Sequence, residues 1–140
     1  MPMPTGFRII PKYGIVFIQH SGLITVKESM DAIAAYAAHP DAAPGQKHLV
    51  DCAPVTDYER DWARIMSIQA RMTEVIKPDG PETLLVLHAP AGMPRTVANL
   101  IRKSWEGNGP VLPRIVDTEA EALDLVGAKV ACFSDLLAMA

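Results

Sequence analysis

The sequence predicts an α/β domain with a mixed, mostly parallel sheet of about five strands and an N-terminal antiparallel hairpin. One observation behind this is a Thr-x-x-Glu motif that occurs three times, beginning at Thr25, Thr56 and Thr118, each time after a short apolar, β-branched run. In such a motif the threonine hydroxyl accepts from a first-turn amide, and the glutamate reaches back to the threonine N–H. Each copy therefore predicts a helix that follows a strand.

The second observation is that segments 15–18 and 83–87 are apolar on both faces. Strands of this kind are usually central and covered by helices on each side. Segment 7–10 precedes the first of them across the turn-rich link 11–14, which predicts the hairpin. Together the two observations predict the order β-β-α-β-α-β-α-β-α with right-handed crossovers.

Caps and breakers set the remaining elements. A strand is expected at 47–52, and another at 112–116 lies at a sheet edge because Pro113 cannot donate to a ladder. A turn is expected at 77–81. The expected helices run from Thr25 to His39-Pro40, from Thr56 to about Ile76, from near Pro94 to 107–109, and from Thr118 to Gly127. Residues 1–140 are expected to form one domain, with 1–5 a flexible start and 128–140 a tail or short helix.

Helical spacing also predicts which residues face the core. The first helix is expected to bury Val26, Met30, Ile33, Ala34 and Ala37. The second is expected to bury Tyr58, Trp62, Ile65, Met66, Met72 and Ile76, and the third Val97, Leu100, Ile101 and Trp105.

Composition excludes several classes of protein. The chain has 140 residues, 49% hydrophobic and 21% charged, with a net charge of −3. This balance excludes a disordered chain and argues against a nucleic-acid partner, which a basic face would indicate. The longest apolar runs are about five residues, against the roughly 20 that a membrane helix needs. With two distant cysteines and no apolar start, the expected location is the cytoplasm.

Several short motifs carry a resemblance to a known family. They are segment 18–25, the strand end 50–51, Asp57, the turn 92–95 and segment 117–123. In these motifs the chain resembles the SpoIIAA-like branch of the STAS family, the sulphate-transporter and anti-sigma-factor-antagonist domains. The likeness covers nearly the whole chain. The fold is also distantly similar to that of CRAL-TRIO-type lipid carriers.

The resemblance implies a non-enzymatic module that binds a partner kinase and is released by serine phosphorylation at the start of the second helix. The family's Asp-Ser-Ser-Gly signature falls at 57–60, where Asp57 is kept and Tyr58 replaces the phosphoacceptor serine. Regulation by serine phosphorylation is therefore not expected. Thr56 is a nearby hydroxyl, interpreted as a helix cap.

Four polar residues stand at the carboxyl ends of predicted strands, where ligands bind in open α/β sheets. These are His20, Asp51, Cys52 and His88. Two imidazoles, a carboxylate and a thiol could supply a nucleophile with its base, or three metal ligands. The structural alternative is a set of satisfied polar groups and a buried thiol. No local motif supports catalysis or metal binding, so no catalytic residue, metal or cofactor is predicted.

Two further sites are candidates for a ligand. The turn from His88 through Gly92 to Arg95 combines a helix N-terminus with a guanidinium, which suits an anion or carboxylate. The second candidate is a flexible apolar pocket between the second and third helices, although core packing alone explains the same residues. The pocket would be lined by Trp62, Met66, Met72 and Trp105.

Three hypotheses follow for the function. The first is a non-enzymatic STAS-like module that acts through a protein partner or self-association. The second is a carrier or sensor of a small apolar acid or lipid, with its tail in the pocket and its carboxylate near Gly92 and Arg95. The third is an enzyme that uses Cys52 assisted by His20 or His88.

Overall fold

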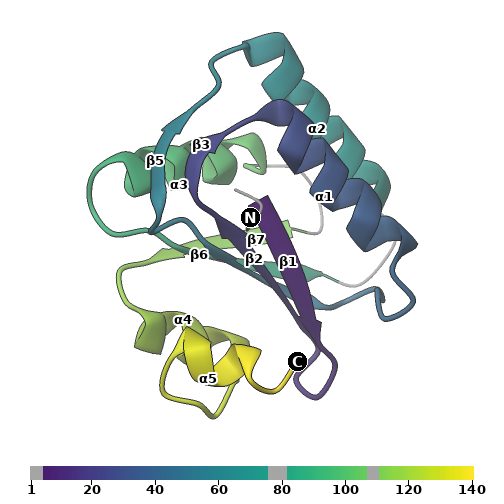
Figure 1. Cartoon of the computed structure of the whole chain (residues 1–140), viewed down its shortest axis with the longest axis vertical. Coiled ribbons are helices and arrows are strands. Elements are labelled where there is room, and N and C mark those ends of the chain that lie inside the picture. The colour runs from purple at the N-terminus through teal and green to yellow at the C-terminus, as the bar shows by residue number, and fades with distance from the viewer. Residues whose placement is uncertain (1–4, 76–81, 107–110) are drawn as a thin grey trace.

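The fold is described from a computed structural model, which describes residues 5–75, 82–106 and 111–140. A five-stranded sheet forms its centre, in the order β1-β2-β4-β6-β7 (Figure 1). β1 pairs antiparallel with β2, and the other neighbours are parallel. The strands are β1 (Thr5–Ile10), β2 (Ile15–His20), β4 (Lys47–Asp51), β6 (Thr83–His88) and β7 (Val111–Val116).

Helices cover both faces of this sheet. α4 (Glu119–Val126) and α5 (Phe133–Leu137) lie on one side, while α1 (Val26–Ala38), α2 (Trp62–Val75) and α3 (Met93–Ser104) lie on the other (Figure 1). The mixed sheet, its hairpin and its edge strand with Pro113 confirm the predicted fold class. The helix starts at Thr25 and Thr118, the stop at Gly127 and the short final helix are also confirmed. Within the described residues, no helix has the length and hydropathy needed to cross a bilayer.

Two expectations concern segments beyond the described residues: the flexible start, which falls mainly on 1–4, and the turn at 77–81. The third helix ends earlier than the predicted stop at 107–109, because α3 ends at Ser104 with Trp105 as its C-cap.

The side of the sheet beneath α4 and α5 is closely packed. Phe17 and Leu49 from the strands meet Leu123 and Leu136 from the two helices in one buried cluster. Phe133 of α5 packs edge-on against Phe17, with ring centroids 5.2 Å apart. Burial of this apolar surface supplies the stabilisation that fixes the sheet.

A second, two-stranded sheet was not predicted. β3 (Gly22–Ile24) pairs in parallel with β5 (Val55–Tyr58), beside the main sheet. The prediction that Thr56 caps the second helix is wrong, because Thr56 is an exposed residue of β5. The helix begins at Trp62, and Asp61 precedes it, with its carboxylate accepting from the Arg64 N–H at 3.3 Å. Local capping geometry at 56–59 gave way to strand pairing with β3.

Two predicted helix faces also need correction. On α1, Ala34 and Ala37 are exposed, whereas Ser29 and Tyr36 are buried. Tyr36 is held inward because its hydroxyl donates to Gln46 Oε1 at 2.5 Å, and this sets the rotation of the helix. On α2 no residue of the helix is buried, so it does not form the predicted core face.

The two confirmed caps and the failed one provide a matched test. Thr118 Oγ1 accepts from the Glu121 N–H at 3.1 Å, whereas the Thr56 side chain is exposed on a strand. We expect Thr118→Ala to lower the free energy of unfolding by about 1 kcal/mol, and Thr56→Ala to change it by less than about 0.5 kcal/mol. Urea denaturation of both variants measures this. Equal losses in the two variants would contradict the assignment.

Candidate functional site

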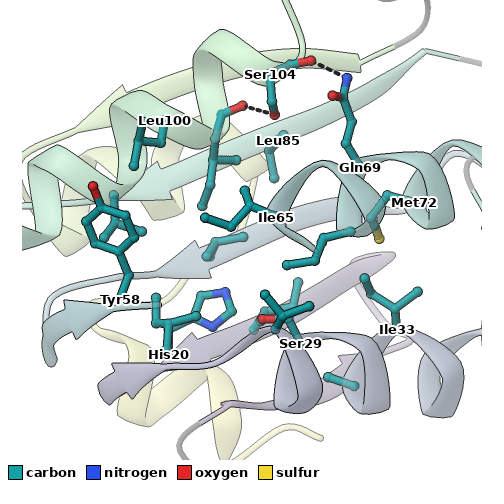
Figure 2. A pocket seen from close by; sticks show the side chains of 18 of the residues that line it. His20, Ser29, Ile33, Tyr58, Ile65, Gln69, Met72, Leu85, Leu100 and Ser104 are labelled. Carbon is teal, nitrogen blue, oxygen red and sulfur yellow. Dashed lines mark hydrogen bonds between the residues drawn. The ribbon is translucent and has the colours of Figure 1, made fainter. Parts of the chain in front are cut away.

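A cavity of about 520 Å³ lies between the sheet and helices α1, α2 and α3. Its volume is within the range of small-molecule sites. Figure 2 shows side chains from β2, β6 and the three helices pointing into it. The sheet and the segment after β5 contribute Phe7, Val16, Ile18, His20, Ile24, His48, Val50, Tyr58, Glu59 and Leu85. The helices and their ends contribute Thr25, Val26, Ser29, Ala32, Ile33, Tyr36, Trp62, Ile65, Met66, Ile68, Gln69, Met72, Val97, Leu100, Ile101, Lys103, Ser104 and Trp105.

The floor of the cavity follows from strand alternation. Successive side chains of a strand point to opposite faces, so Val16, Ile18 and His20 of β2 share one face. His48 and Val50 of β4 lie on that same face. The residues between them, such as Phe17 and Leu49, point into the cluster beneath α4 and α5. An apolar floor on this face is therefore a direct result of strands that are apolar on both sides.

The roof of the cavity is α2, a helix that stands off from the sheet. Its ties to the rest of the fold are partly polar: Gln69 Nε2 donates to the Ser104 carbonyl of α3, as Figure 2 shows, and Arg64 pairs with Glu59 at 2.9 Å. Trp62 and Met66 line the cavity and are also 53% and 56% exposed. We therefore place an opening of the cavity beside these two residues.

The far end of the cavity is closed by a buried polar group. His48 is 5% exposed and packs edge-on against Tyr36, with ring centroids 5.5 Å apart. Tyr36 is itself fixed by Gln46, which also donates to the Asp41 carbonyl at 2.8 Å and accepts from the Ala43 N–H at 3.1 Å. Loop 39–46 therefore holds the Tyr36 and His48 rings in place.

Both cavity imidazoles are neutral at neutral pH. Burial lowers the pKa of His48 to about 4. Burial also lowers the pKa of His20 to about 4, and the nearby Asp51 carboxylate offsets this only in part. Because desolvation disfavours the charged form, each ring is a neutral imidazole with one N–H donor and one nitrogen acceptor rather than a cation.

The predicted cluster of four strand-end residues does not form one site. His20 and Cys52 lie on the cavity side of the sheet, although Cys52 is packed in a buried cluster with Val50 and Leu87 and does not itself line the cavity. His88 lies on the opposite side, where its ring packs on Phe133 at 5.2 Å. Successive side chains of a strand point to opposite faces of the sheet. Given the register of β4 with β6, Cys52 and His88 therefore lie on opposite sides of it.

Asp51 and His88 form a buried polar pair on the α5 side. Asp51 Oδ1 lies 2.9 Å from His88 Nδ1 and accepts from the Ala53 N–H at 3.1 Å. Its other oxygen accepts from Gln19 Nε2 at 3.0 Å. These hydrogen bonds satisfy the carboxylate, which is the structural role that buried polar groups commonly have.

Cys52 is poorly suited to nucleophilic chemistry. Its side chain is 0% exposed. Burial, reinforced by the Asp51 charge, raises the pKa of the Cys52 thiol to about 12. The thiolate is the reactive form, and it is scarce at neutral pH under these conditions. In the described part of the chain, no three His, Cys, Asp or Glu residues are grouped as metal ligands.

The predicted anion turn is separate from the cavity. Arg95 Nε donates to the Ala89 carbonyl at 2.8 Å, and its guanidinium pairs with Asp117. Gly92 is the N-cap of α3, with a φ of 103° that favours glycine. Neither these residues nor His88 line the cavity. Arg95 therefore joins the β6–α3 turn to the segment after β7, and the predicted acid site with its carboxylate at Arg95 is not assembled.

The four predicted pocket residues are brought together, in contrast. Trp62, Met66, Met72 and Trp105 all line the cavity. Tyr58 joins them, with its ring 6.4 Å from that of Trp62 and covered by the Arg60 guanidinium at 4.3 Å. Asp57 remains outside, exposed and paired with Arg60 at 2.8 Å.

Sequence reasoning missed the polar residues of the floor and of α1. His48 sits two residues before Val50 on an inward face, so alternation could have placed it in a buried position. Ser29 and Tyr36 were missed because the apolar stripe of α1 was centred on its alanines. Their spacing of seven residues, two helical turns, was the signal that could have found them.

Comparison with known proteins identifies the fold. The solved structure of the anti-sigma factor antagonist SpoIIAA in its unphosphorylated form is similar to this chain, with a TM-score of 0.50 and 17% sequence identity. The match covers 88% of this chain and 97% of that chain. The chain therefore has the SpoIIAA-like STAS fold. No family model matches the sequence, and no curated protein matches it.

The two cysteines should differ sharply in reactivity. Cys132 is partly exposed and Cys52 is buried. We expect Ellman's reagent at neutral pH to label Cys132 in the native protein, and Cys52 only after unfolding. Cys132→Ser should abolish the native reaction. Fast labelling of the Cys132→Ser variant would instead indicate an activated Cys52.

The lowered pKa of His48 predicts how stability depends on pH. Between about pH 6.5, the ordinary histidine pKa, and about pH 4, the unfolded chain binds a proton at this position that the folded chain does not. Stability is therefore lost as the pH falls through this window. His48→Gln should flatten the decline by up to about 1.4 kcal/mol per pH unit. Urea denaturation at several pH values measures this, and parallel curves for both proteins would contradict it.

Proposed function

We propose that this protein is a non-enzymatic binding or regulatory module that takes a small apolar ligand into the cavity beneath α2. The observation that carries the proposal is a cavity of about 520 Å³ with an apolar floor, roofed by a helix that buries none of its own residues. A helix without a buried face is expected to pack on a partner, and an apolar ligand would supply that contact.

A binding role fits the chemistry of the site better than an enzymatic one. The candidate nucleophile Cys52 has a raised pKa and lies away from the cavity lining. His88, one of the two histidines that could assist Cys52, is engaged with Asp51 on the other side of the sheet. These features support the non-enzymatic alternative.

The likeness to an anti-sigma factor antagonist supports a regulatory role, since the name of that protein describes one that opposes a regulator. We infer that this chain does so without serine phosphorylation at the start of its second helix. In the expected alignment Tyr58 takes the place of that serine; it is the last residue of β5, half-buried, and it lines the cavity (Figure 2). A ligand in the cavity, in contact with Tyr58, would take the place of phosphorylation as the signal.

Contact with a second copy of this chain is a second candidate function. It is favoured by the exposed fractions of Leu23, Trp62 and Met66, which are 50%, 53% and 56%. Trp62 and Met66 are one turn apart on α2, and large exposed apolar side chains often mark an interaction surface. Sedimentation velocity over a range of concentrations tests it: a concentration-dependent dimer that Trp62→Ser abolishes supports this function, and a monomer throughout removes it.

Tryptophan fluorescence provides a direct test of ligand binding, because both tryptophans of the chain line the cavity. We expect butylbenzene to change the emission and to raise the melting temperature. Ile65→Trp, which places a larger ring in the cavity, should weaken binding at least about tenfold. Ser67→Trp on the same helix is the control, since Ser67 is exposed and does not line the cavity.

Circular dichroism of both variants checks that they are folded. No response of the wild-type protein to butylbenzene, phenylbutanol or longer apolar alcohols, together with a clean apo mass in native mass spectrometry, would overturn the proposed function.

A further inference from the structure

We propose that the cavity selects an apolar ligand whose single polar group is uncharged, such as an alcohol or a ketone, and that His48 is the residue that recognises this group. The inference rests on the proposed function and names the ligand class and its orientation. The ligand lies with its polar group at His48 and its apolar end toward Trp62 and Met66.

The first support is the position of His48. It is more than nine-tenths buried, lines the cavity and packs against Tyr36. Among the residues that the structure describes, none makes a hydrogen bond with its ring nitrogens. A polar group that meets His48 in the cavity can therefore form a hydrogen bond that no described residue already makes, and an apolar ligand cannot form it.

The second support is the shape of the cavity. Val16 of β2 is in register with His48 of β4, and His20 lies four residues further along β2. At about 3.3 Å per residue, the His48 and His20 levels are about 13 Å apart. Tyr36 near the end of α1 closes the His48 end, while Trp62 and Met66 near the start of α2 border the opening. A molecule that enters beside Trp62 reaches His48 last.

The third support is the charge distribution around the cavity. β2 and β4 present His20 and His48, α1 presents Tyr36, and the segment around β5 presents Tyr58 and Glu59; the titratable groups of β6 and α2 do not line it, and α3 presents Lys103. Glu59 is engaged with Arg64 and with the Val26 N–H, and Lys103 is exposed. In the described lining, therefore, the only ammonium is that of the exposed Lys103, and no guanidinium is present.

A carboxylate at the His48 end would be a buried charge without a cation. Burial of an unpaired charge is far more costly than burial of a hydrogen-bonded hydroxyl. The imidazole does not relieve this, because its burial keeps it neutral. The only nearby guanidinium that was predicted to serve an acid, Arg95, is paired with Asp117 outside the cavity. An uncharged polar group has no such penalty.

The test uses three ligands that share a phenyl ring and a four-carbon chain: butylbenzene, phenylbutanol and phenylbutyrate. Their dissociation constants are measured by tryptophan fluorescence for the wild-type protein, His48→Phe and His48→Gln. We expect His48→Phe to weaken phenylbutanol about five- to tenfold while leaving butylbenzene unchanged or slightly tighter. His48→Gln keeps a donor and an acceptor and should recover part of the alcohol affinity.

The charge of the ligand is tested with pH. Phenylbutanol affinity should be the same at pH 5 and pH 8. Phenylbutyrate affinity should fall about tenfold per pH unit, or about a thousandfold over this range, because only its neutral form enters and a carboxyl group titrates near pH 4.3. Melting curves at both pH values establish that each variant is folded.

Two results would overturn the inference while leaving the proposed function intact. One is phenylbutyrate binding at pH 8 within about threefold of phenylbutanol. The other is an equal effect of His48→Phe on butylbenzene and phenylbutanol, which would mean that His48 contributes packing alone. If none of the three ligands binds to the wild-type protein, longer apolar alcohols give no response and native mass spectrometry shows a clean apo mass, the proposed function itself fails.

Discussion

The alternation of side chains along β2, β4 and β6 is the constraint on which the rest of the molecule depends. It sends Phe17, Leu49 and Val86 into the cluster beneath α4 and α5. It sends Val16, Val50 and Leu85 to the other face, where the cavity lies. Because one residue of slip would exchange the two sets, the parallel register fixes both the packed core and the floor of the cavity at once. The cluster beneath α4 and α5 and the cavity thus share one sheet and lie on opposite sides of it.

The two faces differ in how they are covered. α4 and α5 contribute fully buried side chains, such as Leu123 and Leu136, to a continuous apolar cluster. α2 contributes none, and its contacts with the rest of the fold include the Gln69 bond to Ser104 and the Arg64 pair with Glu59. Glu59 also accepts from the Val26 N–H at the start of α1, at 3.5 Å. The glutamate that was expected to complete a local capping box therefore links the roof of the cavity to a different helix.

Much of this architecture could be predicted from the sequence, because its signals are local. Strands apolar on both faces, the caps at Thr25 and Thr118, and Pro113 at an edge each follow from a few neighbouring residues. The β3–β5 pair could not be predicted, since it joins segments about 30 residues apart, and this pairing overrode the cap signal at Thr56. Asp51 and Cys52 were expected to meet His88 and His20 in one site. They are adjacent residues at the end of β4, however, so their side chains point to opposite sides of the sheet. Trp62, Met66, Met72 and Trp105 were correctly grouped because helical spacing is a local property.

That α2 contributes nothing fully buried has a consequence for how such a protein can change over evolutionary time. Substitutions on the inner side of this helix alter the volume and the contour of the cavity, and they leave the cluster beneath α4 and α5 without change. Met72 and Val75 are the helix's half-buried contacts with the other buried clusters. Most new specificities are limited by the stability that they sacrifice. Here the cavity and the cluster beneath α4 and α5 lie in separate layers, so descendants of this chain could change the shape of the cavity while that cluster stays the same.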